Sequence, residues 1–148
     1  MTNNQPGCPL CRRTDHNVIW QDTLCRIERV TGEEGARFAG YCLVVWHAHV
    51  AEMTELSASE RRHLMQVVFA VEAALRALLR PDKINLASLG NLVPHLHWHV
   101  IPRWQDDGHF PASIWTPAQA LGTQRTGPET AVLRASIEQV LAEEGAGA

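Results

Sequence analysis

The chain has 148 residues, of which 45% are hydrophobic, and this predicts one compact domain with a core rather than a disordered chain. Its net charge of −3 argues against a dedicated nucleic-acid-binding protein, whose affinity would come from basic side chains. No apolar run reaches the length of a membrane span and residues 1–6 do not form a signal peptide, so we expect a cytoplasmic protein.

A pair of cysteines stands near the start of the chain, at Cys8 and Cys11. The Cys-x-x-Cys spacing has three interpretations: half of a zinc site, a redox pair, or no function. A thioredoxin-like redox motif would follow a strand, and the segment before Cys8 is too short to form one. We therefore favour a zinc half-site, or the remnant of one, over a redox pair.

Three strands are expected in the next stretch of chain, at residues 17–20, 23–30 and 42–46. A short turn between the first two would make them a hairpin. Residues 31–36, which are polar and rich in glycine, are expected to form a loop. Residues 42–46 form a continuous apolar run, which is typical of a buried central strand. His47 follows this strand and is interpreted as a surface residue.

A long helix is expected to begin after Ser57 and to end before Pro81. Ser57 and Glu60 have the spacing of a capping box, in which each side chain caps the backbone of the other. The apolar residues then recur at spacings of three and four, which is typical of one buried helix face. They are Leu64, Val68, Val71, Leu75 and Leu78.

Residues 83–89 are expected to form a further strand. Gly90 and Asn91 would then make a tight connection, such as a hairpin turn, into the histidine-rich segment that follows. Because glycine permits close approach of the backbone to a phosphate, Gly90 and Asn91 are candidate nucleotide-binding residues.

Three histidines alternate with apolar residues in the segment 94–103, at His95, His97 and His99. Successive side chains of a strand point to opposite faces, so the three imidazoles would line one face of a sheet. Pro102 is expected to mark the end of this strand.

Histidines in this arrangement permit two kinds of chemistry. As metal ligands, two neighbours about 6.6 Å apart could converge on one ion, but the outer pair, about 13 Å apart, could not. A catalytic zinc ion would therefore need a ligand from elsewhere, such as His49. Alternatively, one neutral imidazole could attack phosphorus while a neighbour donates protons or hydrogen bonds to the charged oxygens.

The end of the chain is expected to contain an irregular apolar stretch at residues 110–115, a linker at 116–127 and a helix at 128–143. We therefore predict an α+β fold: about five antiparallel strands, one long helix and a C-terminal helix, with the histidines on the sheet face that the helices leave free. Residues 1–115 would form the catalytic domain, and residues 116–148 a linker and a helix packed on it.

The sequence His-Leu-His-Trp-His-Val-Ile resembles the signature of the histidine triad (HIT) superfamily of nucleotide hydrolases and transferases. Within it, the chain looks like the bacterial, diadenosine polyphosphate hydrolase-like members. The resemblance implies that His97 is a nucleophile that forms a nucleotidyl-histidine intermediate, and that His99 stabilises the phosphoryl oxygens. It also implies that the substrates are nucleoside phosphoramidates or dinucleoside polyphosphates.

The resemblance favours hydrolysis, because related transferases often have glutamine where His99 stands. It implies that His95 and His49 orient the catalytic pair or bind zinc. Asn85 is the nearest match to an asparagine that contacts the nucleotide in the family. Two alternatives are a metal-dependent hydrolase with the triad as ligands, and a nucleotide-binding regulatory protein with little turnover.

The resemblance further implies a structural zinc ion, with no organic cofactor. Its ligands would be Cys8, Cys11, His49 and His95, although Trp46 stands where the family commonly has a proline before the histidine at position 49. A homodimer is also expected. Five tryptophans in a small domain, among them Trp115 in an irregular apolar stretch, are typical of a protein with an interface.

Overall fold

The structure is a computed structural model that describes residues 3–12 and 15–146. It contains one antiparallel sheet with the strand order β1-β2-β3-β5-β4, which confirms the predicted α+β fold. The strands are β1 (Val18–Gln21), β2 (Cys25–Arg29), β3 (Cys42–Trp46), β4 (Lys83–Ala87) and β5 (His97–Arg103). Because β5 lies between β3 and β4, the histidine-rich strand is held on both sides.

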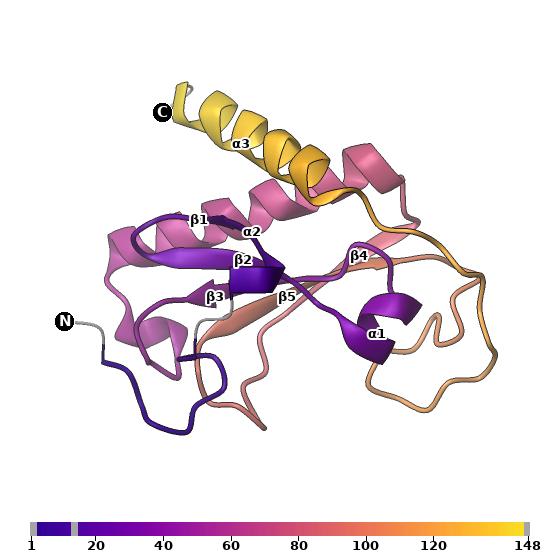
Figure 1. Cartoon of the computed structure of the whole chain (residues 1–148), viewed down its shortest axis with the longest axis horizontal. Coiled ribbons are helices and arrows are strands. Elements are labelled where there is room, and N and C mark those ends of the chain that lie inside the picture. Colours follow the sequence, from indigo (N-terminus) through magenta and orange to yellow (C-terminus); the bar gives the residue numbers. More distant parts are fainter. Residues whose placement is uncertain (1–2, 13–14, 147–148) are drawn as a thin grey trace.

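Two helices cover one side of the sheet, and Figure 1 shows them stacked above it. The long helix α2 (Ala58–Leu79) contacts β3 and β5, and α3 (Thr130–Ala146) contacts α2 and β1. The short elements are η1 (Asp15–Asn17), α1 (Gly32–Arg37) and η2 (Met53–Glu55). Within the described residues, no helix is both long enough and apolar enough to cross a membrane.

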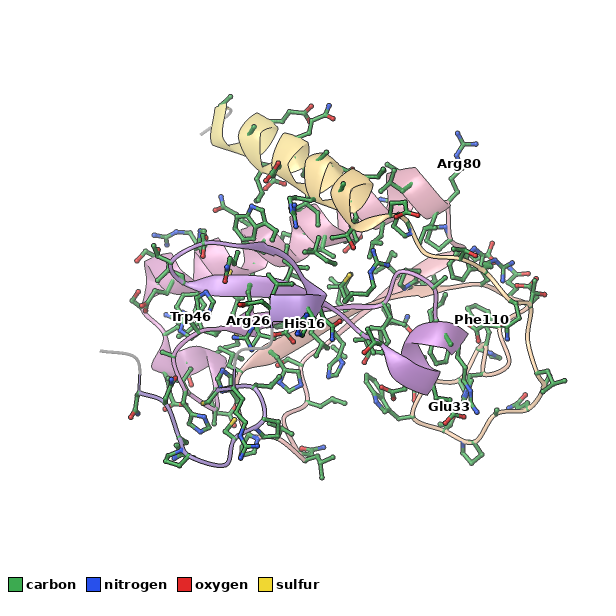
Figure 2. All side chains as sticks on the ribbon, in the orientation of Figure 1. His16, Arg26, Glu33, Trp46, Arg80 and Phe110 are labelled. Atoms are coloured by element: carbon green, nitrogen blue, oxygen red, sulfur yellow. The ribbon has the colours of Figure 1, made fainter. Side chains whose placement is uncertain are left out.

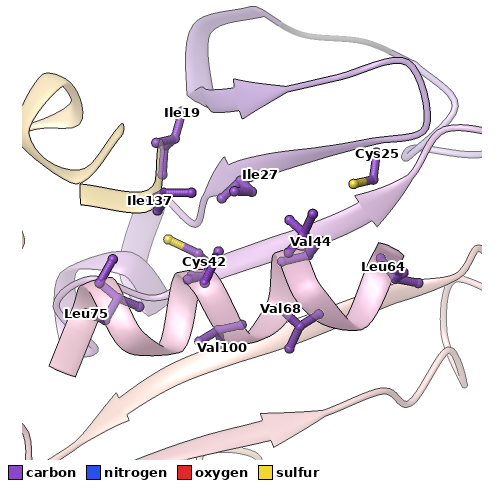
Figure 3. Close-up of a cluster of buried hydrophobic side chains, with 14 of the residues drawn as sticks. Ile19, Cys25, Ile27, Cys42, Val44, Leu64, Val68, Leu75, Val100 and Ile137 are labelled. Carbon is purple, nitrogen blue, oxygen red and sulfur yellow. The ribbon is translucent and has the colours of Figure 1, made fainter. Parts of the chain in front are cut away.

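The main core lies between α2, α3 and the sheet. Leu64 and Val68 of α2 pack with Val44 of β3 and Val100 of β5, and all four side chains are buried (Figure 3). Ile137 of α3 joins the same cluster from the other helix. Apolar side chains at helical spacing and on one face of each strand therefore produce this layer, as the sequence predicts.

The long helix begins and ends where the sequence indicates. At its start, the Ser57 side chain accepts a hydrogen bond from the Glu60 backbone N–H, and the Glu60 carboxylate accepts one from the Ser57 N–H at 2.7 Å. At its end, Arg80 adopts a left-handed conformation with φ of 49°, directly before Pro81, and its side chain extends away from the fold (Figure 2).

We expect Ser57→Ala to lower the free energy of unfolding by about 1 kcal/mol, because a helix donor loses its partner. Urea denaturation followed by circular dichroism measures the change. The matched control is Ser136→Ala inside α3, where alanine is the better helix former and no such loss is expected. Equal effects of the two substitutions would contradict a capping role for Ser57.

Two expectations about the connections are wrong. The glycine-rich segment 31–36 is not a loop, because residues 32–37 form α1, in which Glu33 and Arg37 make an ion pair one turn apart. The connection at Gly90 and Asn91 is not tight, because nine residues separate the end of β4 from the start of β5. Residues 89–93 of this longer segment line a cavity together with His97 and His99.

The boundaries of the histidine strand also differ from the expectation. His95 precedes β5, and Pro102 lies within it. Pro102 is tolerated because β3 pairs with β5 only up to Val100, so a missing N–H breaks no bond to that neighbour. His95 is instead held by Leu96, whose N–H donates to Val50 and whose carbonyl accepts from Trp46.

Candidate functional site

His97 lies at the start of β5, paired with Val45 of β3. Its Nδ1–H donates to the backbone carbonyl of His95 at 2.5 Å. A neutral imidazole has one N–H, so this bond leaves the lone pair on Nε2. The side chain is only 8% exposed, so the expectation of a freely exposed strand face is wrong for His97. It is enclosed by the segment that connects β4 to β5.

His99 lies two residues further along β5, and its ring is 4.9 Å from that of His97. The ring contacts Trp115 edge-on at 5.0 Å, and Nδ1 lies 2.6 Å from the Tyr41 hydroxyl. Burial, together with the neighbouring His97, lowers the pKa of His99 to about 4. His99 is therefore neutral at physiological pH, with one ring nitrogen that donates and one that accepts.

A cavity of about 360 Å³ opens beside these two histidines. Its wall combines the 89–93 segment with three side chains from elsewhere, namely Glu34, Tyr41 and Trp115. Gly90 and Asn91 therefore line the cavity that also contains His97 and His99. A second hollow of about 210 Å³, lined partly by residues 51–54, also borders His97 and shares Leu89 and Gly90 with the first.

Asn85 lies on the same face of the sheet but not in the lining of either hollow. It pairs with Ile101 on β5, and its Oδ1 accepts a hydrogen bond from Arg103 Nη1 at 2.9 Å. Arg103 is buried and also forms a two-point ion pair with Asp107. In this structure Asn85 therefore helps to position the segment after β5.

Sequence reasoning missed Glu34 and Tyr41 as residues of the site. Both belong to the segment before β3, far from the histidine motif in sequence. The register between the strands brings them there, because Leu43 is the partner of His99. The sequence does indicate that Tyr41 directly precedes the predicted central strand. Its contact with His99, however, can be predicted only when the register between β3 and β5 is known.

Four side chains lie close together at the His95 end of the triad: Cys8, Cys11, His49 and His95. One ligand atom from each lies within 4.8 Å of all the others. Nδ1 of His95 is 3.5 Å from both sulfur atoms, and Nδ1 of His49 is 3.3 Å from Cys11 Sγ. Neighbouring ligand atoms in a tetrahedral zinc site with sulfur and nitrogen donors lie about 3.3–3.8 Å apart. The donor set and its spacing therefore fit a zinc ion.

The hydrogen bonding of His95 is also consistent with a role as a zinc ligand. Its Nε2–H donates to the carbonyl of Trp46 at 2.6 Å, which leaves the lone pair on Nδ1, facing the cysteines. Burial lowers the pKa of His95, which keeps the ring neutral. Trp46, the residue in place of the expected proline, thus fixes His95 through its backbone carbonyl.

A second cluster of three candidate ligands, Asp22, Cys25 and His63, has a different character. Asp22 accepts hydrogen bonds from the Leu24 and Cys25 N–H groups and from His63 Nε2–H, which stabilises the β1–β2 turn. Cys25 is fully buried, and burial raises the pKa of its thiol far above the usual range. These hydrogen bonds explain why the three residues lie close together: they form a network that stabilises the turn.

His47 is not the surface residue that the sequence indicated. It is 7% exposed, and its Nε2–H donates to the carbonyl of Asp22 at 3.0 Å. This bond joins the end of β3 to the turn between β1 and β2, which is a structural rather than a catalytic position.

The sequence model of the HIT domain family matches residues 12–106. This is more than half of the chain, and the chain therefore belongs to the HIT domain family. A Mycobacterium tuberculosis protein named AP-4-A phosphorylase is 31% identical over 77 residues, which cover 48% of this chain and 40% of that protein. A HIT-like protein of Saccharolobus solfataricus is 30% identical over 73 residues, covering 46% and 52%. The chain thus spans about half or less of these curated relatives.

Solved structures show the same fold. A histidine triad protein from Sinorhizobium meliloti superimposes with a TM-score of 0.64 at 27% identity, covering 83% of this chain and 87% of that one. A zinc-bound histidine triad family protein from Mycobacterium smegmatis has a TM-score of 0.56 at 20% identity, covering 88% and 87%. At 20% identity the similarity shows the fold alone.

The depressed pKa of His99 predicts a loss of stability in acid. The unfolded chain binds a proton on this residue near its ordinary pKa of 6.5, whereas the folded chain does so only near about 4. As the pH falls between these values, the unfolded state gains protons first and the free energy of unfolding falls. We expect His99→Asn to reduce this loss.

Urea denaturation of wild type and His99→Asn at about pH 7.5 and about pH 5 measures the difference. Both proteins are compared at the same metal content, so that a difference between them comes from the residue at position 99. An identical pH dependence in the two proteins would contradict the depressed pKa of His99.

Proposed function

We propose that this protein is a nucleotide hydrolase that uses His97 as a covalent nucleophile. Nε2 of His97 attacks the phosphorus of the nucleotide, and an N–P bond forms as the bond to the leaving group breaks. The leaving group departs with the electron pair and takes one proton from solvent, which the proton released in the second step replaces. Water then attacks the same phosphorus, the N–P bond breaks, and its electron pair returns to Nε2. The products are a nucleoside monophosphate and one proton released to solvent.

The observation that carries this proposal is the hydrogen bond from His97 Nδ1–H to the carbonyl of His95. It orients the ring and, in the neutral imidazole, places the lone pair on Nε2, as a nucleophile requires. His99, whose ring is 4.9 Å away, is available to hydrogen bond to the phosphoryl oxygens. Membership of the HIT domain family supports the assignment.

The charges around the cavity favour phosphoramidates over dinucleoside polyphosphates. Among the described residues that line it, Glu34 is the only charged side chain, and there is no lysine or arginine. A carboxylate disfavours a chain of several phosphates and favours a cationic amine as the leaving group. The partial similarity to AP-4-A phosphorylase supports the polyphosphates instead. A side-by-side assay of adenosine and guanosine phosphoramidates and dinucleoside polyphosphates distinguishes the two classes.

The proposal includes a structural zinc ion held by Cys8, Cys11, His49 and His95. Four protein donors complete a tetrahedral site and leave no open position for a water or substrate, so the ion would not take part in hydrolysis. The donor arrangement therefore favours covalent catalysis over a metal-dependent mechanism. It also leaves His97 and His99 free for the nucleotide.

The proposal also includes a homodimer, as the family resemblance implies. Trp115 is 45% exposed, and Leu92 beside it in the cavity wall is 93% exposed. Burial of such apolar side chains by a second copy would stabilise an interface. Sedimentation velocity at micromolar concentration is expected to give the mass of two chains, and a strict monomer would remove this part of the proposal.

Trapping the intermediate tests the covalent mechanism directly. Wild-type protein is mixed with an adenosine phosphoramidate, quenched without acid because the N–P bond is acid-labile, digested and examined by mass spectrometry. We expect the mass of an adenylyl group on the peptide that contains His97. An adduct on another residue, or turnover at full rate with no adduct under rapid quenching, would refute the mechanism.

A further inference from the structure

Tyr41 is held rigidly against the histidines although it lies 58 residues away from His99 in the chain. Its backbone N–H donates to Phe38 at 3.1 Å, and its carbonyl accepts from Val30 at 3.0 Å. The side chain is 2% exposed and packs in a small cluster with Phe38, Ile101 and Ile114. From this position its hydroxyl reaches Nδ1 of His99 at 2.6 Å, and the two rings are 5.9 Å apart.

The direction of this hydrogen bond follows from the protonation of the two groups. Burial, and to a lesser extent the nearby Glu34, raises the pKa of the Tyr41 hydroxyl well above its usual range, so the hydroxyl keeps its proton. His99 is neutral and carries a single N–H. Within the described part of the chain, His99 Nδ1 is the one hydrogen-bond partner of the Tyr41 hydroxyl. The hydroxyl therefore donates, and Nδ1 accepts.

We infer that Tyr41 is a positioning residue that holds His99 in the tautomer with its proton on Nε2, making His99 a hydrogen-bond donor toward a phosphoryl group at His97. This inference rests on the proposed function. His97 is held in the opposite tautomer, because its Nδ1–H donates to the His95 carbonyl and its Nε2 keeps the lone pair. Two adjacent histidines thus have different roles because they have different partners: one attacks, and the other donates.

The test variant is Tyr41→Phe, which removes the hydroxyl and keeps the ring. Long-range ¹H–¹⁵N spectra of ¹⁵N-labelled protein report the tautomer of each histidine, and the His99→Asn spectrum identifies the His99 signals. In wild type we expect a protonated Nε2 and a hydrogen-bonded, unprotonated Nδ1. In Tyr41→Phe we expect the Nδ1 signal to move to the position of a nitrogen without a hydrogen bond, and a second tautomer to be populated.

Kinetics on an adenosine phosphoramidate give the second measurement. Losing one ordering hydrogen bond should lower kcat by about tenfold while KM changes little, because the contact acts on the transition state. Phe38→Leu is the control, since Phe38 packs in the same cluster without touching His99. It is expected to lower stability but to leave the His99 tautomer and kcat unchanged.

The outcomes separate this inference from the proposed function. A wild-type His99 with its proton on Nδ1 overturns the inference, whether or not the protein hydrolyses nucleotides. Unchanged spectra and unchanged kcat in Tyr41→Phe also overturn it, and so does an equal effect of Phe38→Leu on the tautomer. If wild type hydrolyses none of the nucleotides, the proposed function fails, while the spectra still decide whether Tyr41 sets the tautomer.

Discussion

Replacing His97 with alanine is expected to lower turnover of every nucleotide substrate by more than about a thousandfold. Loss of a single oxyanion donor typically costs about a hundredfold to a thousandfold, and loss of the nucleophile removes the reaction path itself. Binding should be affected much less, because the cavity walls formed by residues 89–93 and Trp115 remain. Steady-state kinetics and a binding titration with a nucleoside monophosphate measure the two effects.

The fold should survive this substitution, because His97 lines the cavity and lies outside the main apolar core. Circular dichroism and urea denaturation check this. The matched control is His16→Ala, an exposed histidine before β1, which should keep wild-type kinetics. Wild-type rates in His97→Ala on both phosphoramidates and dinucleoside polyphosphates would end the covalent hypothesis.

Removal of the two N-terminal cysteine thiols is expected to abolish zinc binding. Protein purified without added metal should contain about one zinc ion per chain, and the double variant Cys8→Ser, Cys11→Ser should contain almost none, because two of the four donors required by a tetrahedral site are lost. The melting temperature should fall by roughly 5 °C or more, since each kcal/mol lost shifts it by roughly 2–4 °C in a domain of this size. Elemental analysis and calorimetry measure both.

The control for this experiment is Cys25→Ala, which alters the second cluster with Asp22 and His63. It should keep one zinc ion per chain, although it will lose stability because Cys25 is fully buried. Zinc that is absent from wild type, or that survives in the double variant, would rule out the Cys8–Cys11 site. Zinc lost only in Cys25→Ala would assign the metal to the second cluster instead.

Two neighbouring histidines of the chain, His95 and His97, lie in different groups of residues. His95 faces the cysteines through Nδ1, and its carbonyl fixes His97 through a hydrogen bond. A metal ion at His95 would therefore stabilise the same segment that orients the proposed nucleophile. The two variants should therefore also differ in their kinetics. The double cysteine variant should retain some turnover, whereas His97→Ala should lose nearly all of it.

Local patterns in the sequence determined the parts of the fold that depend on neighbouring residues. The capping box at Ser57 and the apolar spacing after it predict α2, and the run at residues 42–46 predicts β3 with its observed bounds. The alternation of His97 and His99 with apolar residues predicts that both lie on one face of a strand. Each of these patterns reports a backbone periodicity that the residues themselves favour.

The tertiary structure decided which distant residues meet. The glycines of the 31–36 segment indicate a loop, but residues 32–37 form α1, and Phe38, which follows it directly, packs in a buried cluster with Ile101 of β5. Asn85, chosen as the nearest match to the family's nucleotide-contacting asparagine, contacts Arg103 instead of lining the cavity. Tyr41 reaches His99 only through the register of β3 with β5.

The cluster of Cys8, Cys11, His49 and His95 shows the same division between what the sequence indicates and what the fold decides. The Cys-x-x-Cys spacing by itself left zinc, redox and no function open, and the family resemblance was needed to name His49 and His95 as partners. In the structure Cys11 is 3.5 Å from His95, 84 residues later in the chain. Contacts over such separations depend on strand order and register, and on which side of the sheet each loop follows, and these are properties of the whole fold rather than of any short stretch of sequence.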